Sequence, residues 1–78
     1  MPNNINEMFK RNEIKKRYLV RRIGEENMLI KNIPYNSEIR YVLKQAEDNF
    51  FYSAPEVVDY CFKILKDFIE LDENEYNK

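Results

Sequence analysis

Few side chains in this chain of 78 residues could carry out covalent chemistry. The sequence contains no His and a single Cys, Cys61. Without His it lacks the commonest general base and the commonest metal ligand, and one Cys forms neither an intrachain disulfide nor a thiolate metal cluster. Cys61 falls among apolar residues at helical spacing, so we interpret it as a buried packing residue rather than a nucleophile.

Carboxylates are plentiful, but their spacing is typical of turns and of a solvated tail. The pairs Glu25-Glu26 and Glu47-Asp48 each precede an Asn, as acidic residues in turns do. The segment 72–75 lacks the turn Gly and the distal Glu of a calcium-binding loop, and one Gly in the whole chain excludes a Gly-rich phosphate loop. We therefore expect no enzyme, no cofactor and no bound metal ion.

Cations interleaved with tyrosine are the strongest remaining indication of a binding surface. The net charge of the chain is only −1, but the charges are unevenly distributed. Residues 1–45 hold ten cations and five acids, whereas residues 46–78 hold three cations and nine acids. Seven cations fall between Lys10 and Arg22, around Tyr18. Such a segment is typical of a surface that contacts phosphates or an acidic protein. The other interpretation is that the acidic C-terminal half neutralises it within the folded chain.

The C-terminal third predicts a long amphipathic helix from Ala54 to about Leu71. Ser53 and Glu56 have the spacing of a capping box, and Pro55 suits a first helical turn. The apolar residues cover an arc of roughly 200°, wider than the ~100° stripe of an ordinary surface helix. We expect the N-terminal segment of the same chain to cover this face. The alternative is that a second chain covers it, which would make the protein a homodimer through this helix.

Upstream, two turn signals predict hairpins. The segments 24–27 and 46–49 both end in Asn, which tolerates left-handed backbone angles, and β-branched and aromatic residues flank them. This predicts strands at 17–23, 28–33, 38–44 and 50–53, with a further turn at 34–37. Residues 38–47 also fit a helix, and we favour the strand because Tyr41-Val42 prefers extended backbone. The helical stripe consists of Ile39, Val42, Leu43, Ala46 and Phe50.

The predicted fold class is therefore α+β. A small antiparallel β-meander of about four strands precedes one long C-terminal amphipathic helix, in a single domain over residues 1–78. Residues 1–12 and 72–78 are polar and are expected to fray. Apolar runs reach only three residues, too short for a signal peptide or a membrane span, so we expect a cytoplasmic protein that does not enter membranes.

These features predict a non-catalytic protein-protein interaction module, because aromatic side chains and complementary charge are typical of interfaces. A phage or mobile-element inhibitor of a host nucleic-acid enzyme or defence complex is one concrete form. The partner is then another protein, from the host or a second copy. The alternative is a small dimeric nucleic-acid-binding regulator that uses segment 10–22. The expected partner-binding residues are Arg17, Tyr18, Arg21, Arg22, Tyr35 and Tyr41.

Overall fold

The computed structural model describes residues 5–30 and 36–77, and all the regular elements in these ranges are helices. Helix α1 spans Ile5–Glu25, α2 spans Ser37–Glu47, α3 spans Pro55–Leu65 and the short α4 spans Glu73–Tyr76. No β-strand occurs in the described ranges. The predicted antiparallel sheet is therefore wrong, and the chain is all-helical rather than α+β.

The predicted strands 17–23 and 38–44 lie inside α1 and α2. In α2 the buried residues are Ile39, Val42 and Ala46, which have helical spacing, so the alternative interpretation of 38–47 is the correct one. Strand preference is a weak signal that burial of an apolar helix face readily overrides. Residues 28–30 and 50–52 form turns, whereas 31–35, which include Tyr35 and half of the predicted 34–37 turn, lie outside the described residues.

Two Asn residues adopt the left-handed backbone that their turn signals predict. Asn27 has φ 56° and Asn49 has φ 54°, which confirms the predicted conformation. They follow the ends of α1 and α2, however, and so terminate helices instead of joining strands. Phe50 shares this conformation with φ 53°, unusual for a bulky residue, and its side chain is fully buried.

The termini of α2 and α3 differ from one another in how they are capped. Helix α2 begins after Asn36, whose side-chain oxygen accepts a hydrogen bond from the Ile39 N–H at 2.9 Å. Helix α3 begins after Ala54 with Pro55 at its start and ends at Leu65, six residues before the predicted end. The predicted capping box is also wrong, because the Ser53 hydroxyl instead donates to the Gln45 side-chain oxygen at 2.7 Å.

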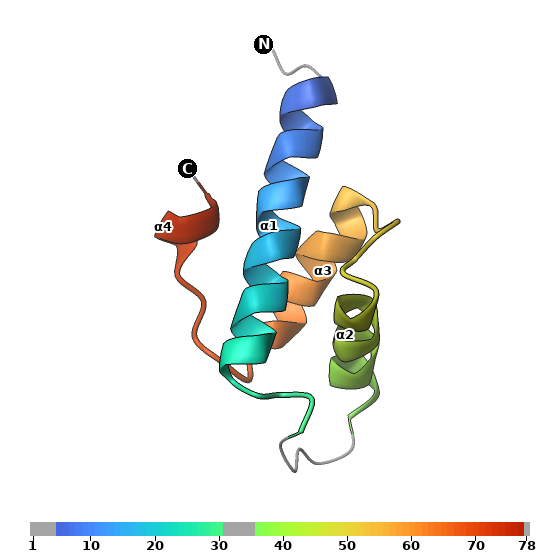
Figure 1. The fold of residues 1–78 in the computed structure, drawn as a ribbon, viewed down its shortest axis with the longest axis vertical. Helices are drawn as coiled ribbons and strands as arrows, with labels where there is room; N and C mark the ends of the chain where they lie inside the picture. Colours follow the sequence, from blue (N-terminus) through green and yellow to red (C-terminus); the bar gives the residue numbers. More distant parts are fainter. Residues whose placement is uncertain (1–4, 31–35, 78) are drawn as a thin grey trace.

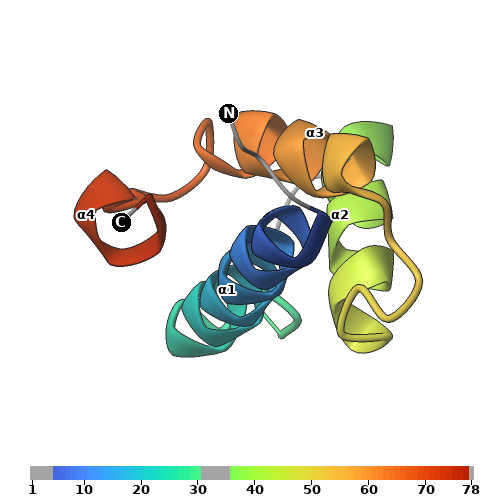
Figure 2. The ribbon, with the colours of Figure 1, turned by 90° about the horizontal axis from the view of Figure 1, so that it is seen from above.

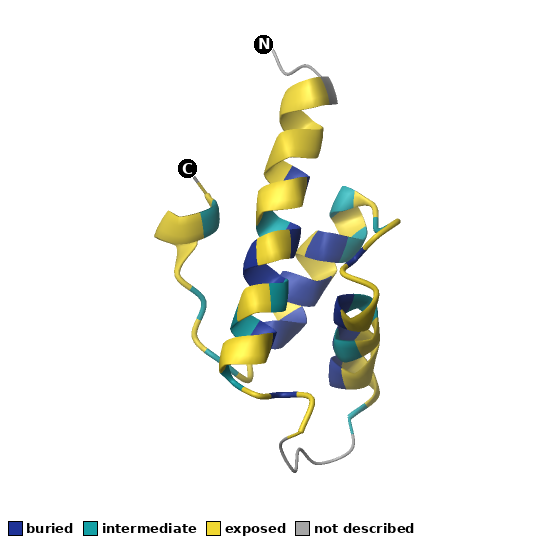
Figure 3. Ribbon diagram, viewed as in Figure 1, coloured by how far each residue is buried: buried dark blue, intermediate teal, exposed yellow. Residues whose placement is uncertain are grey.

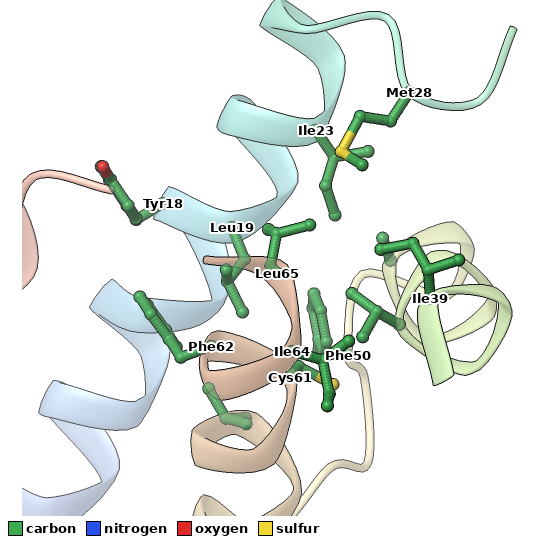
Figure 4. Packing of buried hydrophobic residues seen from close by; sticks show 13 residues of the cluster. Tyr18, Leu19, Ile23, Met28, Ile39, Phe50, Cys61, Phe62, Ile64 and Leu65 are labelled. Atoms are coloured by element: carbon green, nitrogen blue, oxygen red, sulfur yellow. The ribbon is translucent and has the colours of Figure 1, made fainter. Parts of the chain in front are cut away.

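The hydrophobic core lies where α1, α2 and α3 meet. Helix α3 packs against both α1 and α2, and α1 also packs against α2. Figure 2 shows these three helices around one central space, and Figure 4 shows side chains from each of them pointing into it. Helices of the same chain thus cover most of the apolar arc of α3, whereas Tyr60 in that arc stays 40% exposed. The buried residues of α3 are Val58, Cys61, Phe62, Ile64 and Leu65.

The C-terminal segment returns to the side of α1 that faces away from α2 (Figure 1). The Asp72 N–H donates to the Tyr18 hydroxyl at 2.6 Å. The ring of Tyr76 lies 4.8 Å from the Tyr18 ring and 4.4 Å from the Phe62 ring, measured between centroids. Because α4 is only four residues long, these contacts rather than helix propensity hold it in place.

Helix α1 is much longer than the helices that it packs against. Its 21 residues span about 31 Å, whereas the 11 residues of α2 or α3 span about 16 Å. The first buried side chain of α1 that the structure describes is Asn12, and residues 6–11 are all exposed, as the yellow upper turns in Figure 3 show. We call residues 6–11 the overhang of α1.

Candidate interaction surface

Two adjoining hollows lie over α2, α3 and the turn that connects them. One has a volume of about 400 Å³ and the other of about 690 Å³. Tyr41 and Val57 line both, so the hollows form one continuous surface. We call it the aromatic groove and define it by its apolar side chains and its acidic rim. These residues are Tyr41, Phe51, Tyr52, Val57 and Tyr60 with Glu38, Asp48 and Glu56.

The aromatic rings of the groove pair with one another but remain open to solvent. Tyr41 and Tyr60 meet edge to face with centroids 5.8 Å apart, and Phe51 and Tyr52 do the same at 4.6 Å. Tyr52 is 92% exposed and Phe51 is 68% exposed. A cluster of large apolar side chains held in water costs hydration free energy, and such clusters are typical of binding surfaces.

Helix starts place two of the three acids of the rim, and the third, Asp48, lies at the end of α2. Glu38 and Glu56 lie in the first turns of α2 and α3, where a carboxylate interacts favourably with the helix dipole. Tyr41 follows Glu38 by three residues and Tyr60 follows Glu56 by four, so each ring lies on the same helix face as an acid. Lys and Arg are missing from the described residues that line the groove, which leaves its charge negative.

A hydrogen bond joins the rim to the rings. The Tyr60 hydroxyl donates to Glu38 Oε2 at 3.3 Å. Partial burial, and after it the charge of the Glu38 carboxylate, raise the pKa of Tyr60, because both oppose formation of the phenolate. Tyr60 therefore keeps its proton at neutral pH and remains a donor to Glu38.

The predicted cationic site residues lie along α1, where they contact acidic groups of the same chain. Arg17 is exposed and its Nε lies 3.9 Å from Glu13. Arg21 contacts Glu75 of α4 at 2.6 Å, and Arg22 contacts Glu25 at 2.9 Å. Arg22 also donates to the backbone carbonyl of Glu70 from Nη2 at 3.1 Å. The Arg21–Glu75 and Arg22–Glu70 contacts join the basic half of the chain to the acidic half, whereas the pairs with Glu13 and Glu25 are local to α1.

The three predicted tyrosines occupy different environments. Tyr18 is buried, with its ring stacked on Phe62 at a centroid distance of 6.1 Å. Tyr35 lies outside the described residues. Tyr41 lies in the aromatic groove on α2. Because α1 supplies no described residue of the groove lining, the structure does not bring Tyr41 together with Arg17, Tyr18, Arg21 or Arg22.

Reactive chemistry elsewhere in the described part of the chain is limited. Cys61 is fully buried, and burial raises the pKa of its thiol to about 11, so it is protonated and shielded at neutral pH. No three thiol or carboxylate side chains in the described ranges converge to hold a metal ion. None of the described helices is long and apolar enough to cross a membrane.

Most of the groove residues were not among those predicted from the sequence. The sequence pattern places Phe51 and Tyr52 in a strand and Tyr60 in the apolar arc of the C-terminal helix. A helical interpretation of 38–47 would have indicated part of the groove, because it places Glu38 and Tyr41 on one helix face, with Asp48 directly after the helix. The pairing of that face with Tyr60 depends on how α2 and α3 pack.

Comparison with known protein families, with curated proteins and with solved structures finds no match to this chain. The function of this chain is therefore inferred from the geometry of its aromatic groove.

Proposed function

We propose that this chain is a non-catalytic protein-protein interaction module that binds its partner in the aromatic groove. The observation that carries the proposal is the groove itself, in which exposed aromatic side chains of two helices and their connecting turn meet beside three carboxylates. Aromatic residues are enriched at interfaces because they bury a large area at low cost in side-chain entropy.

The chemistry of the groove defines the kind of partner that fits. An apolar anchor on the partner would enter between the rings, and Lys or Arg beside that anchor would meet Glu38, Asp48 and Glu56. A segment of alternating cationic and apolar character is thus the expected ligand. Proteins that bind nucleic acids display cationic surfaces, so an inhibitor of such a protein, encoded by a phage or mobile element, is one form of this function.

The ion pairs of α1 favour this proposal over a nucleic-acid-binding regulator. Lys15 lies 3.0 Å from Asp59, and Arg21 and Arg22 also contact carboxylates. A phosphate approaching this part of segment 10–22 would have to displace acids already bound there. We further propose a cytoplasmic location, since a buried, unpaired Cys61 persists most readily in a reducing compartment.

Peptide display tests the proposal with random sequences in place of a natural partner. We expect peptides selected on the intact protein to be enriched in Lys or Arg next to aromatic or aliphatic residues. A selected peptide should bind at least tenfold more weakly to a Phe51→Ser/Tyr52→Ser variant, a loss of about 1.4 kcal/mol. Both side chains are exposed, so the variant should fold normally.

Ile30→Ser is the matched control, because Ile30 is 82% exposed and lies outside the residues described for the groove. Its affinity for the same peptide should stay within about twofold of the unmodified protein, well under 1.4 kcal/mol. Selection of acidic peptides, or equal binding by the Phe51→Ser/Tyr52→Ser variant, would show that the groove is not the binding site.

A further inference from the structure

Met8 and Phe9 form a second exposed apolar surface, on the overhang of α1. Met8 and Phe9 precede the buried Asn12 by four and three residues, so they continue the helix face that packs on the core. Beyond the core this face meets water, and Met8 is 52% and Phe9 62% exposed. Lys10 and Arg11 follow at once and are exposed as well.

We propose that a second copy of this chain fills the aromatic groove with its overhang. Phe9 of one copy lies among the groove rings of the other, and Lys10 and Arg11 lie against the acids of the rim. The inference rests on the proposed function because it uses the same groove. It adds a specific occupant, whose cations and apolar anchor match the ligand chemistry that the groove selects.

The positions of the overhang and the groove allow two such contacts in one dimer. The Asn12 side-chain amide donates to the Ser53 carbonyl at 3.4 Å, which places the base of the overhang beside the turn that carries Phe51 and Tyr52. Figure 1 shows the first turns of α1 and the start of α3 toward the same end of the molecule. Two copies related by a two-fold axis therefore exchange overhangs and form the same contact twice.

The same copy cannot supply the occupant. The overhang is continuous with the helical rod of α1, and no α1 residue contributes to the described lining of the groove. Each Phe9 side chain covers roughly 150–250 Å² and a similar area of the groove, so two exchanged overhangs bury about 600–1,000 Å² in total. An interface of that size is at the lower limit for specific association, so we expect a weak dimer that forms as concentration rises.

Sedimentation velocity over a concentration series of roughly 5 to 500 μM tests the dimer. The 9.6 kDa chain should shift from monomer to dimer as concentration rises. Phe9→Ser should weaken dimerisation at least tenfold. Ile30→Ser removes an apolar side chain that is more exposed than Phe9, and it should dimerise like the unmodified protein.

Charge reversal identifies the two surfaces that meet. One variant carries Lys10→Glu and Arg11→Glu, and the other carries Asp48→Lys and Glu56→Lys. Each alone brings like charges together and should stay monomeric, whereas an equimolar mixture pairs opposite charges at both contacts and should dimerise. The second variant should fold normally, because Asp48 and Glu56 are both exposed, and the gain from Lys at the C-terminal end of α2 offsets its cost in the first turn of α3.

Each outcome is decisive. A protein that stays monomeric at the highest concentration overturns the second-copy inference, and if selected cationic peptides still bind the groove, the proposed function stands without it. A dimer that Phe9→Ser disrupts but that the charge-reversed mixture fails to restore also overturns the inference, because the overhangs then contact one another. If the equimolar mixture dimerises while each charge-reversed variant stays monomeric, the exchange between overhang and groove is supported.

Discussion

The adjacent residues Phe50 and Phe51 provide the sharpest test of the structure. Phe50 is 0% exposed, whereas Phe51 is 68% exposed. Removing a fully buried phenylalanine side chain costs about 3–5 kcal/mol, because the apolar contacts are lost and a cavity remains. A chain of this length has a total free energy of unfolding of roughly 4–12 kcal/mol, so Phe50→Ala should remove a large part of it.

Thermal unfolding followed by far-UV circular dichroism measures the effect. At roughly 4–8 °C per kcal/mol for a domain of this size, Phe50→Ala should lower the melting temperature by more than about 12 °C. Phe51→Ala makes the same substitution at the next residue, and its free energy of unfolding should stay within about 0.5 kcal/mol of the unmodified protein. Similar losses at both positions would show that the turn after α2 is packed differently.

A glycine at the same position separates the side chain from the backbone. Phe50 has φ 53°, a conformation that costs an L-residue roughly 1–2 kcal/mol more than glycine. Phe50→Ala retains this strain and Phe50→Gly releases it, so the glycine variant should be the more stable of the two by about 1 kcal/mol. In a regular helix or strand the order is reversed, and an alanine variant more stable than the glycine variant would refute a left-handed Phe50.

Three further predictions address other parts of the fold. Asn36→Ala should destabilise the protein by about 1 kcal/mol in urea denaturation, because it removes the side-chain cap of α2; an unchanged midpoint would argue against that cap. Tyr76→Ala should cost about 1–3 kcal/mol, because it removes two aromatic pairs, with Tyr18 and Phe62, and should be detected as a lower melting temperature; no change would mean that α4 does not pack on α1. Burial raises the pKa of Cys61 from 9.0 to about 11, so its contribution to stability is complete below pH 9 and is lost as pH rises toward 11. Over that interval the melting temperature should fall more steeply for the unmodified protein than for Cys61→Ala, and parallel curves would contradict burial of the thiol.

Several local features could be predicted from the sequence because they depend on one or two residues. Asn27 and Asn49 adopt left-handed backbone, and Pro55 begins a helix, as their side-chain chemistry indicates. The prediction was wrong about the elements that the two Asn residues flank, which are helices and not strands. An Asn in this conformation ends a helix as readily as it turns a hairpin, and the intrinsic preferences of the flanking residues differ by too little free energy to decide between the two.

Composition alone determined that His-based catalysis and an intrachain disulfide bond are excluded in this chain, and the helical spacing around Cys61 indicated a buried thiol. Only the tertiary structure decided that residues 17–23 and 38–44 are helical, because their helices become stable by burying apolar faces against α3. It also decided where a partner could bind. The aromatic groove combines Tyr41 of α2 with Tyr60 of α3. Residues 19 positions apart meet only when the helices pack, and so do Lys15 and Arg21, two of the cations that stood out in the sequence, with the acids Asp59 and Glu75.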